Sequence, residues 1–154
     1  MRYGNSPKHV ADYMLYLANQ ARRTLTPMQL LKLVYIAHGW LLGLHGRPLV
    51  NEEVEAWPYG PVIPTLYHDF KKYGSRVIEY CPSGKPAGFD SDEERVMREV
   101  WDGYGHRTGI SLSALTHEPG SPWAQTMERL GQGAVISNDL IEDHYRRLAT
   151  QHEH

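Results

Sequence analysis

Cysteine is almost absent from this sequence, in which Cys81 is the single cysteine among 154 residues. One thiol cannot form an internal disulfide, and no cysteine-based zinc site can be assembled from it. The fold therefore has to be held by an apolar core. Hydrophobic residues make up 41% of the chain, which is ordinary for a globular domain and sufficient for such a core.

An excess of positive charge is also absent. The chain contains 16 Lys and Arg residues against 18 Asp and Glu residues, and its formal net charge is −2. Binding to a phosphate backbone usually requires a basic surface, so we do not expect nucleic acid as the main partner. The helix predicted within residues 24–46 has apolar residues on nearly every side and leaves no polar face for reading bases, which excludes a helix-turn-helix.

No hydrophobic run reaches the length of a membrane span. The longest apolar stretch, around residues 30–44, is interrupted by Lys32, His38 and Gly39, whereas a span needs about 20 apolar residues in succession. The N-terminal residues lead into no signal-peptide core. We therefore expect a cytoplasmic protein with a single domain over residues 1–154, with its core over about residues 6–148 and a short C-terminal tail.

Motifs for cofactor and metal chemistry are missing. There is no GxxxxGK[ST] loop, and the glycines at 103, 105 and 109 do not follow a strand into a helix as dinucleotide binding requires. His117 and Glu118 are followed by Pro-Gly-Ser rather than by the second histidine of a zincin motif. The terminal His152-Glu153-His154 is interpreted as a frayed end. We predict no cofactor, no metal, no catalytic residues and a non-enzymatic function.

The hydrophobic spacing predicts a mainly α fold. Ser6-Pro7 and Thr26-Pro27 are typical helix starts, with a polar cap followed by a proline in the first turn. The second of these helices is apolar all round, which predicts that it forms the buried centre of the domain. Further helices are expected over residues 64–73, 90–103 and 111–117 and from residues 121 and 137. The expected fold is a compact helical domain of about six helices with a small two-stranded β element.

The β element is expected around residues 49–57. Val54 and Ala56 would share one face, while Glu53, Glu55 and Trp57 would share the other. The prolines and glycine of residues 58–61 predict that this strand ends in a stiff turn. Residues 77–80 are rich in β-formers and are predicted to be the second strand, pairing with residues 49–57.

The acidic cluster formed by Glu52, Glu53 and Glu55 gives the first candidate site. Acidic groups that flank Trp57 and Tyr59 would suit a basic protein partner, because charge steers the encounter and aromatic side chains anchor it. Two alternatives stay open: the carboxylates could be a solvated strand edge, or they could serve a metal-dependent hydrolase. Trp57 could equally be a core residue.

His117 is the second candidate. It ends a predicted helix shortly before Pro119 and Trp123, and it could contact either the turn at residues 57–61 or a partner. A capping role is the alternative. The partner-binding residues predicted from the sequence are thus Glu53, Glu55, Trp57, Tyr59 and His117.

Five strings carry a resemblance to a known family: LLKLVYIAHGW at 30–40, GRPL at 46–49, EAWPYGPVIP at 55–64, LSALTHE at 112–118 and PW at 122–123. In this order and spacing, over about Val10 to Tyr145, they resemble the Panacea domain of phage-associated GepA-like and SocA-like antitoxins. The resemblance implies a non-catalytic bacterial or prophage protein that neutralises a cognate toxin by direct binding.

The family has no agreed catalytic residues. The resemblance implies that five further motif positions, His38, Trp40, Gly60, Pro61 and Trp123, serve folding rather than binding. Three alternatives remain: an adaptor that delivers a toxin to a protease, a phage-encoded inhibitor of a host protein and, less favoured, a small metal-dependent hydrolase using the acidic cluster or His117. The identity of the toxin and the oligomeric state stay open.

Overall fold

The computed structural model describes residues 4–152. Within this range the elements are α1 (Pro7–Gln20), α2 (Pro27–His45), β1 (Val54–Trp57), β2 (Gly60–Val62), α3 (Pro64–Phe70), the 3-10 helix η1 (Lys71–Tyr73), α4 (Ser91–Tyr104), α5 (Gly109–Thr116), α6 (Pro122–Leu130), β3 (Val135–Ile136) and α7 (Asn138–His152). The prediction of a mainly helical domain with a small β element is confirmed, with seven α-helices in the described range. None of these helices is both long enough and apolar enough to cross a membrane.

The C-terminal end differs from the predicted tail. Helix α7 continues to His152, so the segment after residue 148 is helical as far as the structure describes it. Glu153 and His154, the last residues of the His-Glu-His string, lie outside the described residues.

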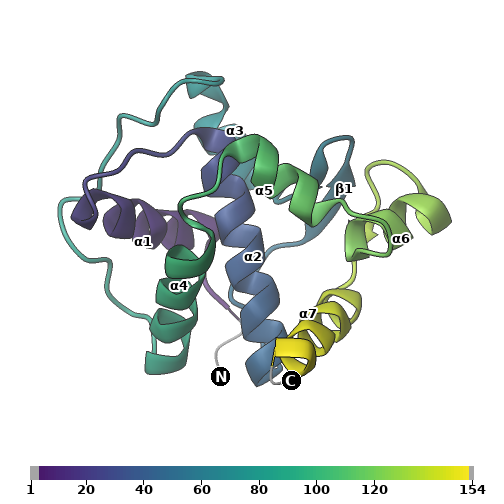
Figure 1. The fold of residues 1–154 in the computed structure, drawn as a ribbon. Helices are drawn as coiled ribbons and strands as arrows, with labels where there is room; N and C mark the ends of the chain where they lie inside the picture. The colour runs from purple at the N-terminus through teal and green to yellow at the C-terminus, as the bar shows by residue number, and fades with distance from the viewer. Residues whose placement is uncertain (1–3, 153–154) are drawn as a thin grey trace.

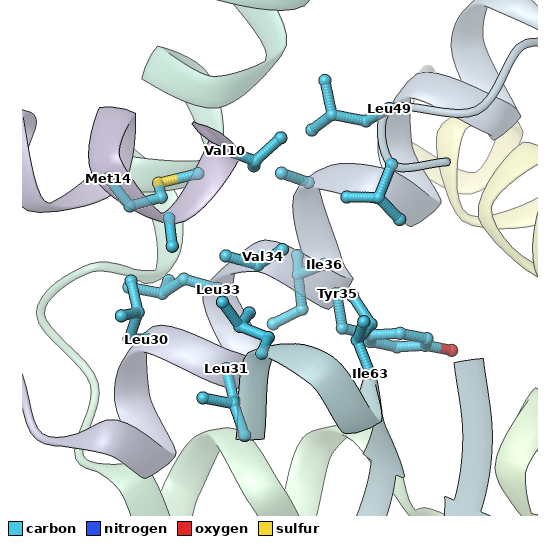
Figure 2. Close-up of a cluster of buried hydrophobic side chains, with 14 of the residues drawn as sticks. Val10, Met14, Leu30, Leu31, Leu33, Val34, Tyr35, Ile36, Leu49 and Ile63 are labelled. Carbon is cyan, nitrogen blue, oxygen red and sulfur yellow. The ribbon is translucent and has the colours of Figure 1, made fainter. Parts of the chain in front are cut away.

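Helix α2 is the centre of the fold, as its all-round apolar pattern predicts. It contacts α1, α3, α4, α5, α7 and β2. Figure 1 shows α2 running through the middle of the molecule, with α1 and α4 on one side, α7 along its C-terminal half and α5 across its N-terminal half. In Figure 2, side chains of α2 project in several directions and meet Val10 and Met14 of α1, Leu49 and Ile63. Burying one such side chain stabilises the fold by about 1.5–3 kcal/mol.

Polar caps set the starts of most helices. The caps that accept a hydrogen bond from the first turn are Ser6, Thr26, Asp90, Thr108, Ser121 and Ser137, which precede α1, α2, α4, α5, α6 and α7. At Thr26 and Asp90 the side chain three residues later also bonds back to the cap, which completes a capping box. Because Thr108 caps it, α5 begins at Gly109, two residues before the predicted start.

The sheet has three antiparallel strands in the order β2-β1-β3. The first strand ends in a turn after Trp57, as the prolines predict, but the prediction is wrong in leaving out β2, because the chain reverses over residues 58–59 and resumes as a strand. Trp57 pairs with Gly60 and Ala56 pairs with Pro61 in this hairpin. Proline is tolerated there because β2 is an edge strand, which needs no hydrogen bonds on its outer side.

The prediction of a strand at residues 77–80 is also wrong. This segment forms no strand, and Ile78 instead packs into the core while its N–H donates to Leu25 O at 2.8 Å. The place beside β1 is taken by β3, in which Val135 pairs with Glu55. Four residues with high β-propensity do not form a strand unless the chain brings a free edge to them.

Helices α2 and α7 pack closely because α2 carries two glycines on the shared face. A Cβ atom at Gly39 would overlap the ring of Tyr145, and one at Gly43 would lie 2.7 Å from the Tyr145 Cβ. Tyr145 is buried and makes edge-to-face contacts with Tyr35 and Trp40. The spacing of four residues between the glycines thus creates the seat for Tyr145.

We expect Gly39→Ala to destabilise the protein by about 1–3 kcal/mol, because the added methyl group forces Tyr145 out of its seat. Gly103→Ala in α4 is the matched control, since nothing lies within 4 Å of its Cβ position. Without a steric conflict, Gly→Ala inside a helix stabilises by up to about 1 kcal/mol. Urea unfolding measures both variants, and equal stability changes would contradict the packing role of Gly39.

Candidate partner-binding surface

The tip of the β1–β2 hairpin is held by side chains from three helices. Trp123 Nε1 of α6 donates to Trp57 O at 2.6 Å, and Ser113 Oγ of α5 donates to Tyr59 O at 2.7 Å. Lys32 Nζ of α2 donates to Pro61 O at 2.8 Å. Alternate backbone carbonyls of the tip, at 57, 59 and 61, are therefore satisfied by the body of the domain, and the tip is fixed in position.

Glycine is required at the end of this turn. Pro58 holds its own φ negative, and Gly60 follows the turn with a φ of 120°, a value that L side chains rarely adopt. A Cβ atom at Gly60 would also lie 3.1 Å from Lys32 Nζ and 3.3 Å from Thr116 Oγ1. The close approach of the hairpin to α2 and α5 thus depends on the missing side chain.

The outer side of the hairpin carries the predicted aromatic residues. Trp57 is half-buried, its ring meets Tyr67 edge-to-face at 5.1 Å, and its Nε1 donates to Glu55 Oε1 at 3.0 Å. The side chain of Tyr59 points outward, and the residue is 73% exposed. Trp57 is therefore neither a fully buried core residue nor a fully exposed one: one side is packed against the fold, and the other is accessible to a partner.

The acidic residues do not form one continuous patch. Glu52 Oε1 accepts from Thr65 Oγ1 at 2.8 Å, and Glu55 accepts from Trp57. Glu53 is exposed and lines a polar hollow of about 630 Å³ between residues 48–53 and 135–138. Glu52 lines the same hollow, so Glu52 and Glu53 share a region of the surface and Glu55 is separate from them.

His117 lies beside the hairpin. It caps the C-terminus of α5, its ring packs against Trp123 at 5.3 Å, and its Nδ1 is 3.5 Å from Ser113 Oγ. Ser113 and Trp123 are two of the three residues that hold the tip. The structure therefore brings His117, Trp57 and Tyr59 to the same region. We call this region, extended along β1 to include Glu55 and Glu53, the hairpin surface.

His38 occupies the interior, far along α2 from the hairpin. Its Nδ1 accepts from the N–H groups of Leu49 and Val50 at 3.2 and 3.3 Å. Its Nε2 therefore carries the proton and donates to Asn138 Oδ1 at 3.0 Å. Burial lowers the pKa of His38 to about 4, so the ring is neutral at physiological pH. It ties α2 to the segment before β1 and to the start of α7.

Trp40 lies on the same half of α2. Its Nε1 donates to the Tyr104 hydroxyl at 3.1 Å, and its ring meets Tyr145 edge-to-face at 5.2 Å. These contacts join α2 to α4 and α7.

An apolar groove borders the hairpin surface on the side of α2 and α3. It encloses about 230 Å³, and its lining includes Met28, Leu31, Lys32, Trp57, Tyr59 and Tyr67. We call it the aromatic groove. Met28, Tyr59 and Tyr67 are among the large hydrophobic residues that remain exposed. Exposed apolar side chains grouped around a concavity are typical of binding sites.

A metal centre is not evident in the described part of the chain. Within residues 4–152, no group of three or more His, Cys, Asp or Glu side chains is arranged so that it could hold a metal ion. Glu52, Glu55 and His117 instead make the contacts given above.

Comparison with known proteins gives the family. The family described as "Antitoxin SocA-like, Panacea domain" matches residues 30–124, from α2 to the start of α6. The chain belongs to this family. The chain is also 32% identical, over 151 residues, to Antitoxin SocA of Caulobacter vibrioides, an alignment that covers 89% of this chain and 80% of that protein. No solved structure matched the chain.

Sequence reasoning does not identify two buried residues, Lys32 and Ser113, that hold the hairpin surface of this Panacea domain in place. In the sequence, Lys32 interrupts an apolar stretch, and Ser113 lies in the string at 112–118 without a role of its own. A lysine in a helix that is apolar on every side has to reach a buried acceptor, which was the available signal for Lys32. Ser113 gave no such signal, because its acceptor lies 54 positions away in the sequence.

We expect acid to destabilise the domain through His38. Below pH 6.5 the unfolded chain protonates this residue, whereas the folded protein does not until about pH 4. The unfolded state therefore binds more protons, and the free energy of unfolding falls by up to about 3 kcal/mol across this window. Equilibrium unfolding measured from pH 7.5 to pH 4 follows this loss.

The matched variant is His38→Gln, which cannot titrate. It should be less stable at pH 7.5, because one side-chain amide cannot replace both ring nitrogens, and it should lose less stability on acidification. The carboxylate of Asp90, whose pKa the Arg47 guanidinium lowers to about 2, loses its contribution at lower pH. Parallel pH profiles of the two proteins would rule out the role of His38.

Proposed function

We propose that this Panacea domain is an antitoxin that neutralises a cognate toxin in the cytoplasm by direct binding, with the hairpin surface as part of the interface. The similarity to Antitoxin SocA across most of both chains supports the antitoxin role. The function belongs to a surface rather than to a set of reacting groups.

The observation that carries the proposal is an exposed aromatic side chain on a fixed backbone. Tyr59 is 73% exposed, yet its carbonyl is held by Ser113, and the neighbouring carbonyls are held by Trp123 and Lys32. An anchor that is already in place loses little conformational freedom when a partner binds. Tyrosine and tryptophan are also the residues that most often dominate binding energy.

Negative charge supports the same surface. Glu53 is exposed beyond one end of β1, and Glu55 lies on β1 next to Trp57. Carboxylates at the rim of an interface accelerate association with a basic partner more than they strengthen the final complex. We infer that the part of the toxin facing β1 is basic.

The experiment combines growth and binding. A host that expresses the gene beside this one is grown with and without the protein, and the pair is purified together. Restored growth with a stable complex supports the proposal, whereas toxicity that persists beside folded antitoxin contradicts it. The half-life of the toxin in the same cells separates direct inhibition, which leaves it unchanged, from delivery to a protease, which shortens it.

We expect Tyr59→Ala to weaken the toxin complex at least tenfold, because it removes a central anchor worth about 2 kcal/mol or more. Its melting temperature should stay close to that of the wild type, since the tip is held through backbone atoms. Tyr80→Ala is the matched control, because Tyr80 is also exposed but borders a different hollow. Equal losses of affinity in both variants, measured by calorimetry, would show that Tyr59 is no anchor.

Charge reversal at Glu53 should act on the association rate. We expect Glu53→Lys to slow association severalfold at low salt and to have less effect at high salt, because salt screens the attraction. Glu79→Lys changes the same charge at another exposed position and serves as the control. Glu55 is avoided because its reversal also breaks the bond to Trp57. Unchanged stopped-flow rates for Glu53→Lys would place the interface elsewhere.

A further inference from the structure

Lys32 is a buried cation whose hydrogen-bond acceptor, among the residues that the structure describes, is Pro61 O. The residue is 3% exposed, and its ammonium group donates to Pro61 O at 2.8 Å. An ammonium group has three N–H donors. Among residues 4–152 no carboxylate forms an ion pair with it, and burial lowers its pKa to about 8. Lys32 therefore remains mostly charged near pH 7, with donors to spare.

Lys32 lies where a bound partner could reach its ammonium group. Lys32 belongs to the lining of the aromatic groove, beneath the Gly60–Pro61 step of the hairpin. Met28, Trp57, Tyr59 and Tyr67 provide apolar walls. A charge held below apolar walls is costly unless an anion meets it, and the same walls strengthen the pair by excluding water.

The rim of the aromatic groove is positively charged, like Lys32 beneath it. Lys71, an exposed residue, also lines the groove, whereas no Asp or Glu does so. This polarity is opposite to that of Glu53 and Glu55 around β1. The groove and the outer strand of the hairpin thus favour groups of opposite charge on a partner.

We propose that the aromatic groove receives a segment of the toxin in which an aromatic or large aliphatic side chain lies next to a carboxylate, and that the carboxylate pairs with Lys32. This proposal rests on the proposed function, because it takes a toxin to be the occupant. A carboxylate fits better than a phosphate, since apolar walls would leave the additional phosphate oxygens without donors.

The first experiment tests the chemistry of the groove with small probes. The full chain is titrated with 3-phenylpropionate and with the neutral 3-phenylpropionamide, while the indole N–H signal of Trp57 and the backbone N–H signal of Gly60 are followed by NMR. We expect the acid to bind at least tenfold more tightly than the amide at pH 7. The preference should fall as the pH is raised above about 8, where Lys32 loses its proton.

Two variants separate charge from structure. Lys32→Met removes the cation, and Lys32→Gln removes the charge while keeping a donor for Pro61 O. Both should lose the preference for the acid. Lys32→Met also leaves Pro61 O without its donor, so the melting temperature of Lys32→Gln, which keeps a donor, checks that the hairpin stays in place. Lys72→Met is the control and should keep the preference, because Lys72 is exposed but does not line the groove. Equal binding of acid and amide, no binding of either, or a preference that survives in Lys32→Gln would overturn the proposal.

The second experiment identifies the occupant. Lys32→Gln should bind the toxin at least tenfold more weakly than the wild type. If both bind equally well, the groove proposal is wrong and the antitoxin function stands. If the wild type binds acids through Lys32 but binds no toxin, the proposed function and the choice of occupant are both wrong. Self-association of the wild type that Lys32→Gln abolishes would make a second copy the occupant, which also contradicts the proposal.

Discussion

The structure depends on the burial of two polar side chains of helix α2, Lys32 and His38. A helix surrounded by other elements offers no solvent to Lys32 or His38, so each must find its hydrogen-bond partners within the protein. Lys32 donates to Pro61 O in the hairpin. His38 forms hydrogen bonds with the segment before β1 and with the start of α7. The same two residues that are expensive to bury therefore fix the elements that cover the helix.

This arrangement joins strings that are far apart in the sequence and that carry the resemblance to the Panacea domain. The string at 30–40 contributes Lys32 and His38, and the strings at 112–118 and 122–123 contribute Ser113 and Trp123. Three of these four side chains meet the carbonyls of the string at 55–64. The fourth, His38, holds the end of the string at 46–49. The hairpin tip is thus rigid by construction, which suits a surface that recognises another protein.

At the proposed interface, residues that the fold needs lie beside residues that it does not need. Trp57 packs against Tyr67 and bonds to Glu55, yet it also lines the aromatic groove. Tyr59 is connected to the fold through its backbone, and its side chain stays free for contact. A partner that meets the hairpin therefore contacts one residue whose loss damages the fold and one whose loss does not.

Features that depend on neighbouring residues can be predicted from the sequence alone. The caps at Thr26 and Asp90, the helix boundaries near prolines, and the all-round burial of α2 follow from local hydrogen bonding and from periodicity. Only the tertiary structure decided which segments pair across long separations. Residues 135–136 occupy the edge of β1 and residues 77–80 do not, because an edge has room for one strand and propensity cannot say which segment arrives there. The separation of Glu55 from Glu52 and Glu53, and the position of Lys32 under the groove, likewise depend on the tertiary structure, because the partners of a side chain are set by the segments that the whole chain brings to it.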